Sequence, residues 1–354
     1  MPLEVTKYKY PILAKPSGIT LEQHTQAVVS EGKLLLEHTP FVVQKYQERV
    51  GKSLAIRLER VCEYHDLGKR NPKWQIACQK DYDAFLQWQS IHGGTFKDYS
   101  KTKNAGENIR KAGVRHEIQS LRLVEKTNLP LPQLASIAAH HGKLGNYFED
   151  RWANENATDL WGAFKKESNR IIEQNSLEKC AIAQYEFAGP RGMLQLVDHR
   201  ASAKEVGEFV PDFTRFSYQF PHKEKRGVQR LIEQHWKDDL LLVRAPTGAG
   251  KTDASLLWAQ LQIENKRADR LVIAMPTRFT SNALAINVSE SLSNTGLYHS
   301  SAWFTKFQEQ VNAGNIKKQE AEKIHEFARL LQTPITVCTI DHLLMALTLT
   351  REDH

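Results

Sequence analysis

The sequence is poor in cysteine and contains no long apolar run. Its four cysteines, at positions 62, 78, 180 and 338 of 354 residues, form no CxxC pair. This spacing argues against a disulfide framework or a zinc knuckle and favours a reducing compartment. No stretch has the length of a membrane-spanning helix, and the first residues, MPLEVTK, lack the apolar core of a signal peptide. We therefore expect a cytoplasmic protein without a membrane partner.

Composition narrows the class of protein without deciding its function. Hydrophobic residues make up 41% and charged residues 25% of the chain, as in soluble globular proteins. The length allows two domains, each with its own core. The net charge of +7 suits a polyanion such as nucleic acid, although a mildly basic soluble protein with no such partner has the same charge. Fourteen histidines are a high number, and their positions are informative.

The motif VCEYHDLGK places an imidazole beside a carboxylate. We expect a helix that begins at Leu54, carries His65 and Asp66 in its last turns and stops at Gly68. Such nitrogen and oxygen ligands suit a divalent metal that activates water for phosphodiester hydrolysis. Lys69 lies three residues after Asp66 and would face a phosphate at the same site. The alternative for Lys69 is a cation that is favourable at a helix C-terminus.

Two further histidines lie on predicted helices. His24 shares a face with apolar residues of a helix over residues 21–29, where a satisfied core histidine is the usual explanation. His116 stands at the start of a helix that runs to residue 125, after a polar, mobile loop over residues 93–114. Neither histidine alone indicates a metal.

A histidine pair and an aspartate complete the set. His140 and His141 end an apolar helix, and a glycine follows them. Burying two imidazoles is costly unless each has a partner, and a metal ion is the natural one. Asp198 ends an apolar run and would be the last ligand, although it could instead pair with Arg200.

Together these positions predict a metal centre. Neutral imidazoles with two carboxylates suit Mn, Fe, Co, Ni or Zn better than Mg, which prefers oxygen ligands. Seven candidate ligands exceed the needs of one ion, so two divalent ions bridged by a carboxylate are the simplest arrangement. The candidates are His24, His65, Asp66, His116, His140, His141 and Asp198.

This order of residues resembles the HD phosphohydrolase superfamily, and His116 with the His140-His141 pair resembles its dinuclear, CRISPR-associated nuclease branch. The resemblance implies an all-α HD domain, residues 1–205. It also implies that His24, His65, Asp66 and Asp198 hold one ion, while Asp66, shared with His116, His140 and His141, holds the other. Lys69 matches the lysine of that branch. The resemblance thus implies catalytic roles for Asp66 and Lys69.

The second half contains a phosphate-binding pattern. After a loop-like linker, residues 206–227, a helix follows from residue 228, and residues 240–244 (LLLVR) are typical of a buried parallel strand. The motif APTGAGKT and a helix come next, which is the context of a P-loop that binds ATP with Mg. Its binding residues would be Thr247, Gly248, Ala249, Gly250, Lys251 and Thr252, with Lys251 on the β and γ phosphates and Thr252 on the magnesium.

The same region resembles superfamily 2 helicases. Gln229 resembles their adenine-reading glutamine, and Thr277, Arg278 and Thr339 resemble loop residues that contact nucleic acid, each after a predicted strand (271–275 and 335–339). Asp341 has an alternative assignment as the Walker B aspartate. The sequence has no Asp-Glu-x-His box, so we expect residues 228–354 to form an incomplete first RecA-like α/β lobe. We do not expect this chain alone to hydrolyse ATP or unwind DNA.

The combination resembles the nuclease–helicase of type I CRISPR interference. This resemblance implies a metal-dependent nuclease of antiviral defence that cuts single-stranded DNA, with a guide-RNA surveillance complex as its partner. Two alternatives stay open: an HD phosphohydrolase of free nucleotides, and a non-catalytic module that binds ATP and nucleic acid.

Overall fold

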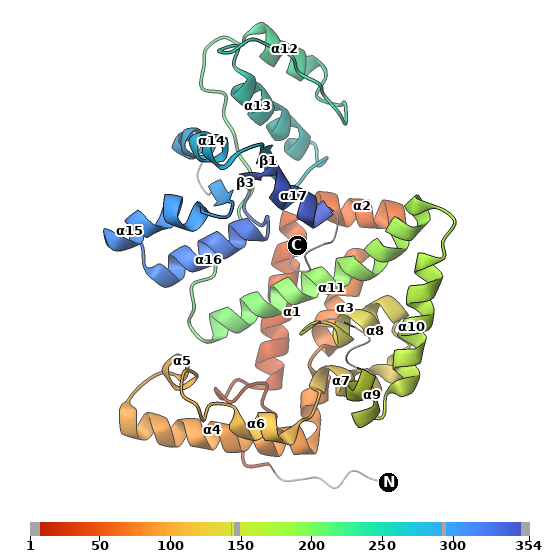
Figure 1. Ribbon diagram of the computed structural model, residues 1–354. Helices are drawn as coiled ribbons and strands as arrows, with labels where there is room; N and C mark the ends of the chain where they lie inside the picture. Colours follow the sequence, from red (N-terminus) through yellow and green to blue (C-terminus); the bar gives the residue numbers. More distant parts are fainter. Residues whose placement is uncertain (1–7, 143, 145–148, 292–294, 348–354) are drawn as a thin grey trace. The chain divides into compact units, whose positions relative to one another are not determined.

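The computed structural model describes residues 8–142, 144, 149–291 and 295–347, which form two compact units (Figure 1). The first unit contains the described residues up to Leu36 and Val43–Glu208; the second contains Glu37–Val42 and the described residues from Phe209 onward. The division at 208 lies close to the predicted boundary at 205. Residues 37–42, however, belong to the second unit, where Asp269 accepts hydrogen bonds from the backbone N–H groups of Phe41 and Val42 at 2.9 and 3.0 Å. Residues 348–354 of the predicted lobe lie outside the described residues.

The regular secondary structure of the first unit is helical within the described residues, apart from one isolated bridge between Leu13 and Thr20. Its helices are α1 (Leu21–His38), α2 (Pro40–Val50), α3 (Leu54–Tyr64), η1 (Leu67–Arg70), α4 (Pro72–His92), α5 (Phe96–Tyr99), α6 (Glu107–Ala112), α7 (His116–Val124), η2 (Glu125–Thr127), α8 (Leu131–Ala138), α9 (Glu149–Asn154), α10 (Thr158–Ile172) and α11 (Leu177–Glu205). No helix of the described residues is long and apolar enough to cross a membrane.

Helix α3 is a central element of this unit and packs against α8 and α11. Ser53 caps its first turn by accepting a hydrogen bond from the Ile56 N–H. Its buried face carries Leu54, Leu58 and Val61, each at most 1% exposed, with the i, i+4, i+7 spacing of one helix face. The helix ends at Tyr64, earlier than predicted, and a 3₁₀ turn follows.

Gly68 has a different role from the helix stop that the sequence predicts. It lies inside the 3₁₀ turn η1, directly against α7, and its N–H donates to Ser120 Oγ at 2.8 Å. A Cβ atom at Gly68 would lie 1.9 Å from the His116 carbonyl oxygen and 2.6 Å from the Ser120 nitrogen. Glycine is therefore required for the close approach of two backbones, and this approach places the two histidine-bearing segments side by side.

The predicted mobile loop over residues 93–114 contains two short helices, α5 and α6. Gly93, with φ of +67°, ends α4 in the left-handed conformation. Asp81, buried on α4, then accepts hydrogen bonds from the backbone N–H groups of Asn108 and Ile109, both at 3.0 Å. These contacts hold α6 against α4 and explain why the segment is ordered despite its polar composition.

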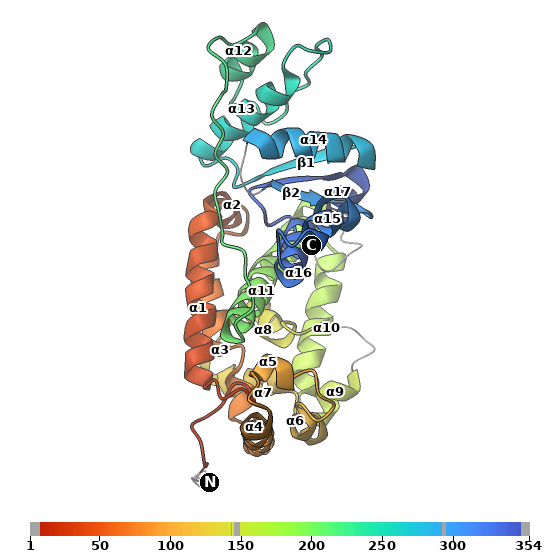
Figure 2. The same ribbon diagram turned by 90° about the vertical axis from the view of Figure 1, so that its left-hand side faces the viewer.

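The second unit combines helices with a small parallel sheet. Its elements are α12 (Gly227–Gln234), α13 (Lys251–Glu264), β1 (Leu271–Met275), α14 (Arg278–Ser291), β2 (Thr295–Tyr298), η4 (Trp303–Gln308), α15 (Glu309–Asn312), α16 (Lys318–Arg329), β3 (Ile335–Thr339) and α17 (Ile340–Leu347). The strand order is β1-β3-β2, so the chain passes from β1 to β2 and returns to the centre. Within this unit α14 lies on one face of the sheet and α16 on the other (Figure 2).

The predicted strands at 271–275 and 335–339 are β1 and β3. They pair in parallel, with Met275 opposite Thr339 at the carboxyl ends. Strand β2 was not predicted. Between β2 and β3 the chain forms a π-helical segment, η4, followed by α15 and α16.

The predicted strand at residues 240–244 is wrong. The described segment forms no strand there, and Leu240 and Leu242 are 77% and 92% exposed. A parallel strand needs hydrogen-bonding neighbours and cover on both faces. The described three-stranded sheet provides residues 240–244 with neither, so apolar composition alone does not produce the strand.

Residues of the predicted linker take part in the core of the second unit. Phe216 and Tyr218 are buried together with Leu256 and Leu257 of α13 and Ile335 of β3. In addition, the Tyr218 hydroxyl donates to the Asp253 carboxylate at 3.0 Å. This segment is therefore packed against its own unit, as the aromatic residues of the linker suggest.

Candidate metal centre

The first unit brings all seven predicted ligand residues to one place. They come from five separate parts of the chain: helix α1 (His24), the turn between α3 and η1 (His65, Asp66), the first turn of α7 (His116), the turn after α8 (His140, His141) and the last third of α11 (Asp198). Six of them are partly or fully buried, and His141 is exposed. The packing of these helices and their turns therefore produces the cluster.

One group of ligand atoms contains His24, His65 and Asp66, which lie within 4.8 Å of one another. His24 Nε2 is 3.3 Å from Asp66 Oδ2 and 3.2 Å from Asp198 Oδ1. His65 Nε2 is 3.5 Å and 3.9 Å from the same two oxygens. Two imidazoles and two carboxylates thus surround a common point.

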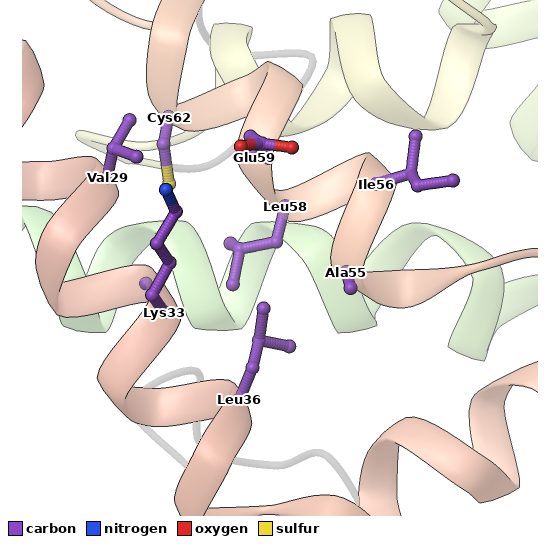
Figure 3. Close-up of a pocket in the computed structure, with 9 residues that line it drawn as sticks. Val29, Lys33, Leu36, Ala55, Ile56, Leu58, Glu59 and Cys62 are labelled. Carbon is purple, nitrogen blue, oxygen red and sulfur yellow. The ribbon is translucent and has the colours of Figure 1, made fainter.

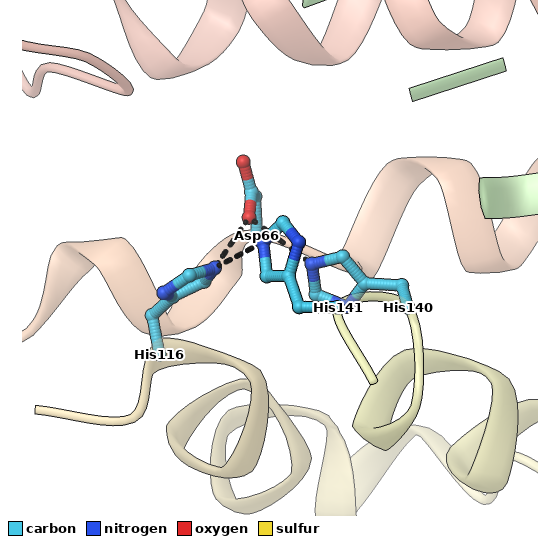
Figure 4. A group of neighbouring side chains, drawn as sticks. All are labelled: Asp66, His116, His140 and His141. Atoms are coloured by element: carbon cyan, nitrogen blue, oxygen red, sulfur yellow. Dashed lines mark hydrogen bonds and ion pairs between the residues drawn. The ribbon is translucent and has the colours of Figure 1, made fainter. Parts of the chain in front are cut away.

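A second group contains Asp66, His116, His140 and His141, again within 4.8 Å of one another. Figure 4 shows the three imidazoles turned toward the Asp66 carboxylate. His116 Nε2 lies 3.2 Å from Asp66 Oδ1 and 3.1 Å from His141 Nε2, while His140 Nε2 lies 3.7 Å from Asp66 Oδ1. The two oxygens of Asp66 therefore face different groups.

Unsatisfied buried atoms test whether a metal fits this cluster. Within the described residues, His65 Nε2, His140 Nε2 and Asp66 Oδ1 are buried and lack a hydrogen-bond partner. Buried polar atoms are normally paired, because an unpaired one costs about 1–3 kcal/mol. Ring nitrogens and carboxylate oxygens are also donor atoms for first-row transition metals. The cluster consequently fits divalent ions of the Mn, Fe, Co or Ni type.

The electrostatics of the cluster keep its carboxylates ionised and shift the pKa values of its imidazoles in opposite directions. Burial lowers the pKa of His65 to about 4, so this ring is neutral at pH 7. Burial also acts to lower the pKa of His24, but hydrogen bonds to Asp198, Asp66 and Glu205 raise it to about 10. Burial acts to raise the pKa of Asp198, yet the hydrogen bond from His24 holds it below its usual range. The proton on His24 therefore offsets part of the carboxylate charge.

Lys69 is paired inside the cluster. Its Nζ lies 2.5 Å from Asp66 Oδ2, and its side chain is 9% exposed. Burial acts to raise the pKa of Asp66, but the charge of Lys69 keeps it well below its usual range. The contact explains why a lysine follows the His-Asp pair at this spacing: the 3₁₀ turn η1 returns residue 69 over residue 66.

The sequence did not single out three residues that surround this cluster. Glu205 Oε1 lies 2.8 Å from His24 Nδ1, Lys15 Nζ lies 2.6 Å from Glu205 Oε2, and Ser202 Oγ lies 3.3 Å from Asp198 Oδ1. Ser202 and Glu205 stand four and seven residues after Asp198, a helical spacing that places all three on one face of α11. That periodicity was a usable signal for Ser202 and Glu205, whereas nothing local connects Lys15 to them.

The first unit also has a small pocket between α1 and α3, with a volume of about 220 Å³. Figure 3 shows Val29, Leu36 and Leu58 around it, with Lys33 and Glu59 also among its lining residues. Burial raises the pKa of Cys62, which also lines it, so this thiol is a poor nucleophile. The pocket is apolar and has no cluster of reactive groups among its described lining residues.

The P-loop of the second unit is largely exposed. Gly248 and Gly250 have φ of +80° and +82°, which only glycine adopts at little cost, and α13 begins at Lys251. Lys251 Nζ donates to the carbonyl oxygens of Ala245 and Pro246, both at 2.9 Å. The loop therefore has left-handed glycines and a helix N-terminus, as the motif requires, although residues 240–244 before it do not form the predicted strand.

The remaining predicted nucleotide-binding residues lie in this loop or beside it. The side chains of Thr247, Ala249 and Thr252 lie in it or at the start of α13, and Thr247 and Thr252 are exposed. The predicted adenine reader, Gln229, is only 1% exposed. It accepts a hydrogen bond from the Arg226 N–H at 2.7 Å and donates to the Gly250 carbonyl at 3.2 Å. In this structure the Gln229 side chain therefore hydrogen-bonds to the loop and links it to Arg226.

The predicted nucleic-acid contacts share one edge of the sheet. Thr277 and Arg278 follow the carboxyl end of β1, and Thr339 ends β3 opposite Met275. Arg278 Nη1 lies 3.3 Å from Ser300 Oγ, and both residues that follow β1 are exposed. The structure thereby gathers these three residues on the side where parallel strands end.

Comparison with known proteins gives a family match in the second half of the chain and sequence similarity to CRISPR-associated proteins. Residues 226–353 match the DEAD/DEAH box helicase family. A putative CRISPR-associated nuclease/helicase Cas3 of Methanocaldococcus jannaschii is 32% identical over 111 residues, which are 30% of this chain. The CRISPR-associated endonuclease/helicase Cas3 of Escherichia coli is 29% identical over 122 residues, also 30% of this chain. Over these segments the chain is similar to Cas3 nuclease/helicases. The resemblance predicted from the motifs is confirmed.

The fold is similar to that of a Cas3 of known structure. The crystal structure of T. fusca Cas3-AMPPNP has a TM-score of 0.50 and 16% sequence identity, and the similarity covers 93% of this chain and 42% of that one. The segments matched in the M. jannaschii and E. coli Cas3 proteins are 15% and 14% of those proteins. This chain therefore corresponds to less than half of such a protein, and the activities of the whole relatives come to it only as proposals.

Proposed function

We propose that the first unit is a metal-dependent nuclease of single-stranded DNA in CRISPR antiviral defence, and that the second unit binds ATP with Mg. The observation that carries the nuclease proposal is the position of Asp66. One of its oxygens belongs to the His24–His65–Asp198 group and the other faces the His116–His140–His141 group. Such a carboxylate can bridge two ions.

Two ions held in this way would supply water activation and would stabilise both the attacking and the leaving oxygens of a phosphodiester. The chain's own residues prepare the site for this chemistry. His65 and His140 are buried and donate through Nδ1 to backbone carbonyls, at 2.8 and 2.6 Å, so that Nε2 faces the cluster in each case. His141, exposed beside the buried His140, places one ligand at the surface where a strand could enter.

Lys69 carries a positive charge at the site and is not one of the candidate metal ligands. Its Nζ pairs with Asp66 Oδ2. With an ion held by Asp66, the Lys69 ammonium would lie beside the reacting centre, where a phosphate oxygen would be its natural partner. We therefore assign Lys69 the role of countering phosphate charge.

Nucleic acid is the preferred substrate because of the second unit. The helicase-family match, together with Thr277, Arg278 and Thr339 at one sheet edge, suits a chain that handles a DNA strand rather than free nucleotides. The relatives are named as CRISPR-associated, and a guide-RNA surveillance complex is the partner that we propose by that relationship.

The test uses the metal-free full chain. It is incubated with circular single-stranded DNA and, separately, with dNTPs, in the presence of Mn, Ni or Mg, beside the Asp66→Ala variant. We expect cleavage of the DNA with a transition metal and none by the variant. Hydrolysis of dNTPs but not DNA would replace the nuclease by a nucleotide phosphohydrolase. Inactivity on both, with metal content near zero by elemental analysis, would leave a non-catalytic binding module.

A further inference from the structure

Three polar side chains lie on one face of α11: the candidate ligand Asp198 and two residues that follow it. Asp198, Ser202 and Glu205 are spaced as i, i+4 and i+7, so they follow one another along the helix surface. Glu205 is a carboxylate outside the predicted ligand set that contacts one of its members: its side chain is only 10% exposed, and its Oε1 lies 2.8 Å from His24 Nδ1. A carboxylate in this position is costly unless it has partners, and both of its oxygens have one.

The partners of Glu205 are a candidate ligand and a lysine. Oε1 accepts a hydrogen bond from His24 Nδ1 at 2.8 Å, and Oε2 accepts one from Lys15 Nζ at 2.6 Å. With its Nδ1 proton held by Glu205, His24 turns Nε2 to within 3.3 Å of Asp66 and 3.2 Å of Asp198. The carboxylate thereby fixes both the tautomer and the orientation of the ring.

Lys15 also contacts the same group of candidate ligands through Ser202. Its Nζ donates to Ser202 Oγ at 2.7 Å, and the Ser202 hydroxyl donates to Asp198 Oδ1 at 3.3 Å. One ammonium group thus supports two candidate ligands of the same group, His24 through Glu205 and Asp198 through Ser202. It also offsets the charge of Glu205, so the carboxylate adds no net charge to the cluster.

The other histidines of the cluster are supported differently. His65 and His140 direct Nδ1 to the backbone carbonyls of Cys62 and Ile137. His116 Nδ1 is 3.7 Å from the nearest Glu117 oxygen, which is beyond hydrogen-bond distance. Within the described residues, His24 is therefore distinct in having a side-chain carboxylate hydrogen-bonded to its outward nitrogen.

We propose that Glu205 and Lys15 are positioning residues that set the affinity of one ion site, the one formed by His24, His65, Asp66 and Asp198. The ion held by Asp66, His116, His140 and His141 does not depend on them, because none of the three histidines contacts Glu205, Lys15 or Ser202 in the described structure. This inference rests on the proposed dinuclear function and adds to it an asymmetry between the two sites.

The experiment compares metal binding by the full chain and three variants. Metal-free protein is titrated with Mn²⁺ by calorimetry, and the bound metal is counted by elemental analysis. Glu205→Gln keeps the size and removes the charge, and Lys15→Met keeps the length and removes the charge. Glu186→Gln is the matched control, since Glu186 also lies on α11 and pairs at 2.7 Å with the buried Arg57, in an ion pair that includes no residue of the cluster.

We expect two ions in the unaltered chain and in Glu186→Gln. In Glu205→Gln one ion should bind as before while the other binds about 10–100-fold more weakly, the usual effect of removing an outer-shell partner. Lys15→Met should weaken the same ion. Retention of the second ion shows that the variants are folded, and circular dichroism checks this independently.

Two results would overturn the inference without touching the proposed function: both ions bound as tightly in Glu205→Gln as in the unaltered chain, or both weakened to the same extent. An unaltered chain that binds no Mn²⁺ would overturn the proposed function, and this inference with it. The two failures are therefore distinguishable in one titration series.

Discussion

The candidate metal centre, called the cluster below, and the P-loop lie in different units, and different contacts stabilise them. The cluster sits among buried helices, and His65, Asp66 and His140 are at most 2% exposed. The P-loop follows a segment whose leucines are up to 92% exposed, and its lysine is bonded to its own loop carbonyls. Both sites correspond to motifs that are recognisable in the sequence, yet only the cluster is enclosed by packing.

The difference shows which kind of motif depends on tertiary contacts. A phosphate loop is mostly a local conformation, fixed by the left-handed Gly248 and Gly250 and by the start of α13. A multi-ligand metal centre has no local conformation, because its ligands lie up to 174 residues apart, from His24 to Asp198 (198 − 24). It exists only when the helices are packed, so damage to packing should affect the two sites unequally.

The largest effect is expected from Asp66→Ala. This change removes the residue shared by both ligand groups, and nuclease activity should fall by at least about 100-fold, since even outer-shell partners change activity by 10–100-fold. Nucleotide binding by the second unit, measured by fluorescence with a labelled ATP analogue, should not change. Loss of both properties together would mean that the two units do not act separately.

Gly68→Ala should strongly destabilise the first unit. A Cβ atom 1.9 Å from the His116 carbonyl must push η1 and α7 apart, at a cost of about 3 kcal/mol. Denaturant unfolding of the metal-free chain measures this loss of unfolding free energy. Mn²⁺ binding should weaken as well, because His116 moves. Gly162→Ala is the control: within the described residues, no atom outside its own helix lies within 4 Å of the place that the alanine methyl would take, and this variant should be neutral or slightly stabilising. Equal stability of the two variants would refute the close-approach argument.

Lys251→Ala should affect the second unit alone. The loss of a charge-assisted contact to phosphate, worth about 1.5–3 kcal/mol, should weaken ATP binding by about 10-fold or more. Metal content and cleavage of single-stranded DNA by the isolated chain should be unchanged. A drop in cleavage in the absence of ATP would show that the P-loop contributes to the nuclease site.

The metal-free protein should lose stability as pH rises from neutral to alkaline. The pKa of His24 is raised from 6.5 to about 10 in the folded state, so folding is favoured by its protonation. This contribution is complete below pH 6.5 and disappears as the pH passes through about 10. The melting temperature of the metal-free chain should fall over this window more steeply than that of His24→Gln. Parallel curves for the two proteins would argue against a protonated His24.

The smallest effect is expected in residues 240–244, where the sequence predicts a strand that the structure does not contain. Leu242→Ser changes a side chain that is 92% exposed, and the unfolding free energy should change by less than about 0.5 kcal/mol. Val337→Ala in β3, where the side chain is fully buried, should cost about 2 kcal/mol for the lost methyl groups and the cavity. A large cost for Leu242→Ser would show that residues 240–244 are buried in solution.

Much of this protein could be predicted from the chain alone. Helical periodicity identified the helix of His24 and the helix before His65, and the resemblance to helicases identified β1 and β3. The candidate ligands were identifiable because histidines beside apolar helix ends need partners. The sequence alone did not predict the absence of a strand at 240–244, the presence of β2 or the role of Gly68. Each of these depends on which segments become neighbours in the fold.

The sequence by itself determined the residue types of the cluster, the P-loop conformation and the relationship to the Cas3 nuclease/helicases. These depend on local spacing and on glycines that permit a positive φ. Only the tertiary structure decided that Asp66 turns its two oxygens to different histidine groups, and that Lys15 and Glu205 support one of those groups. The reason is physical: a side chain's partners across the fold are set by how helices pack, and packing unites residues that have no periodic relation along the chain.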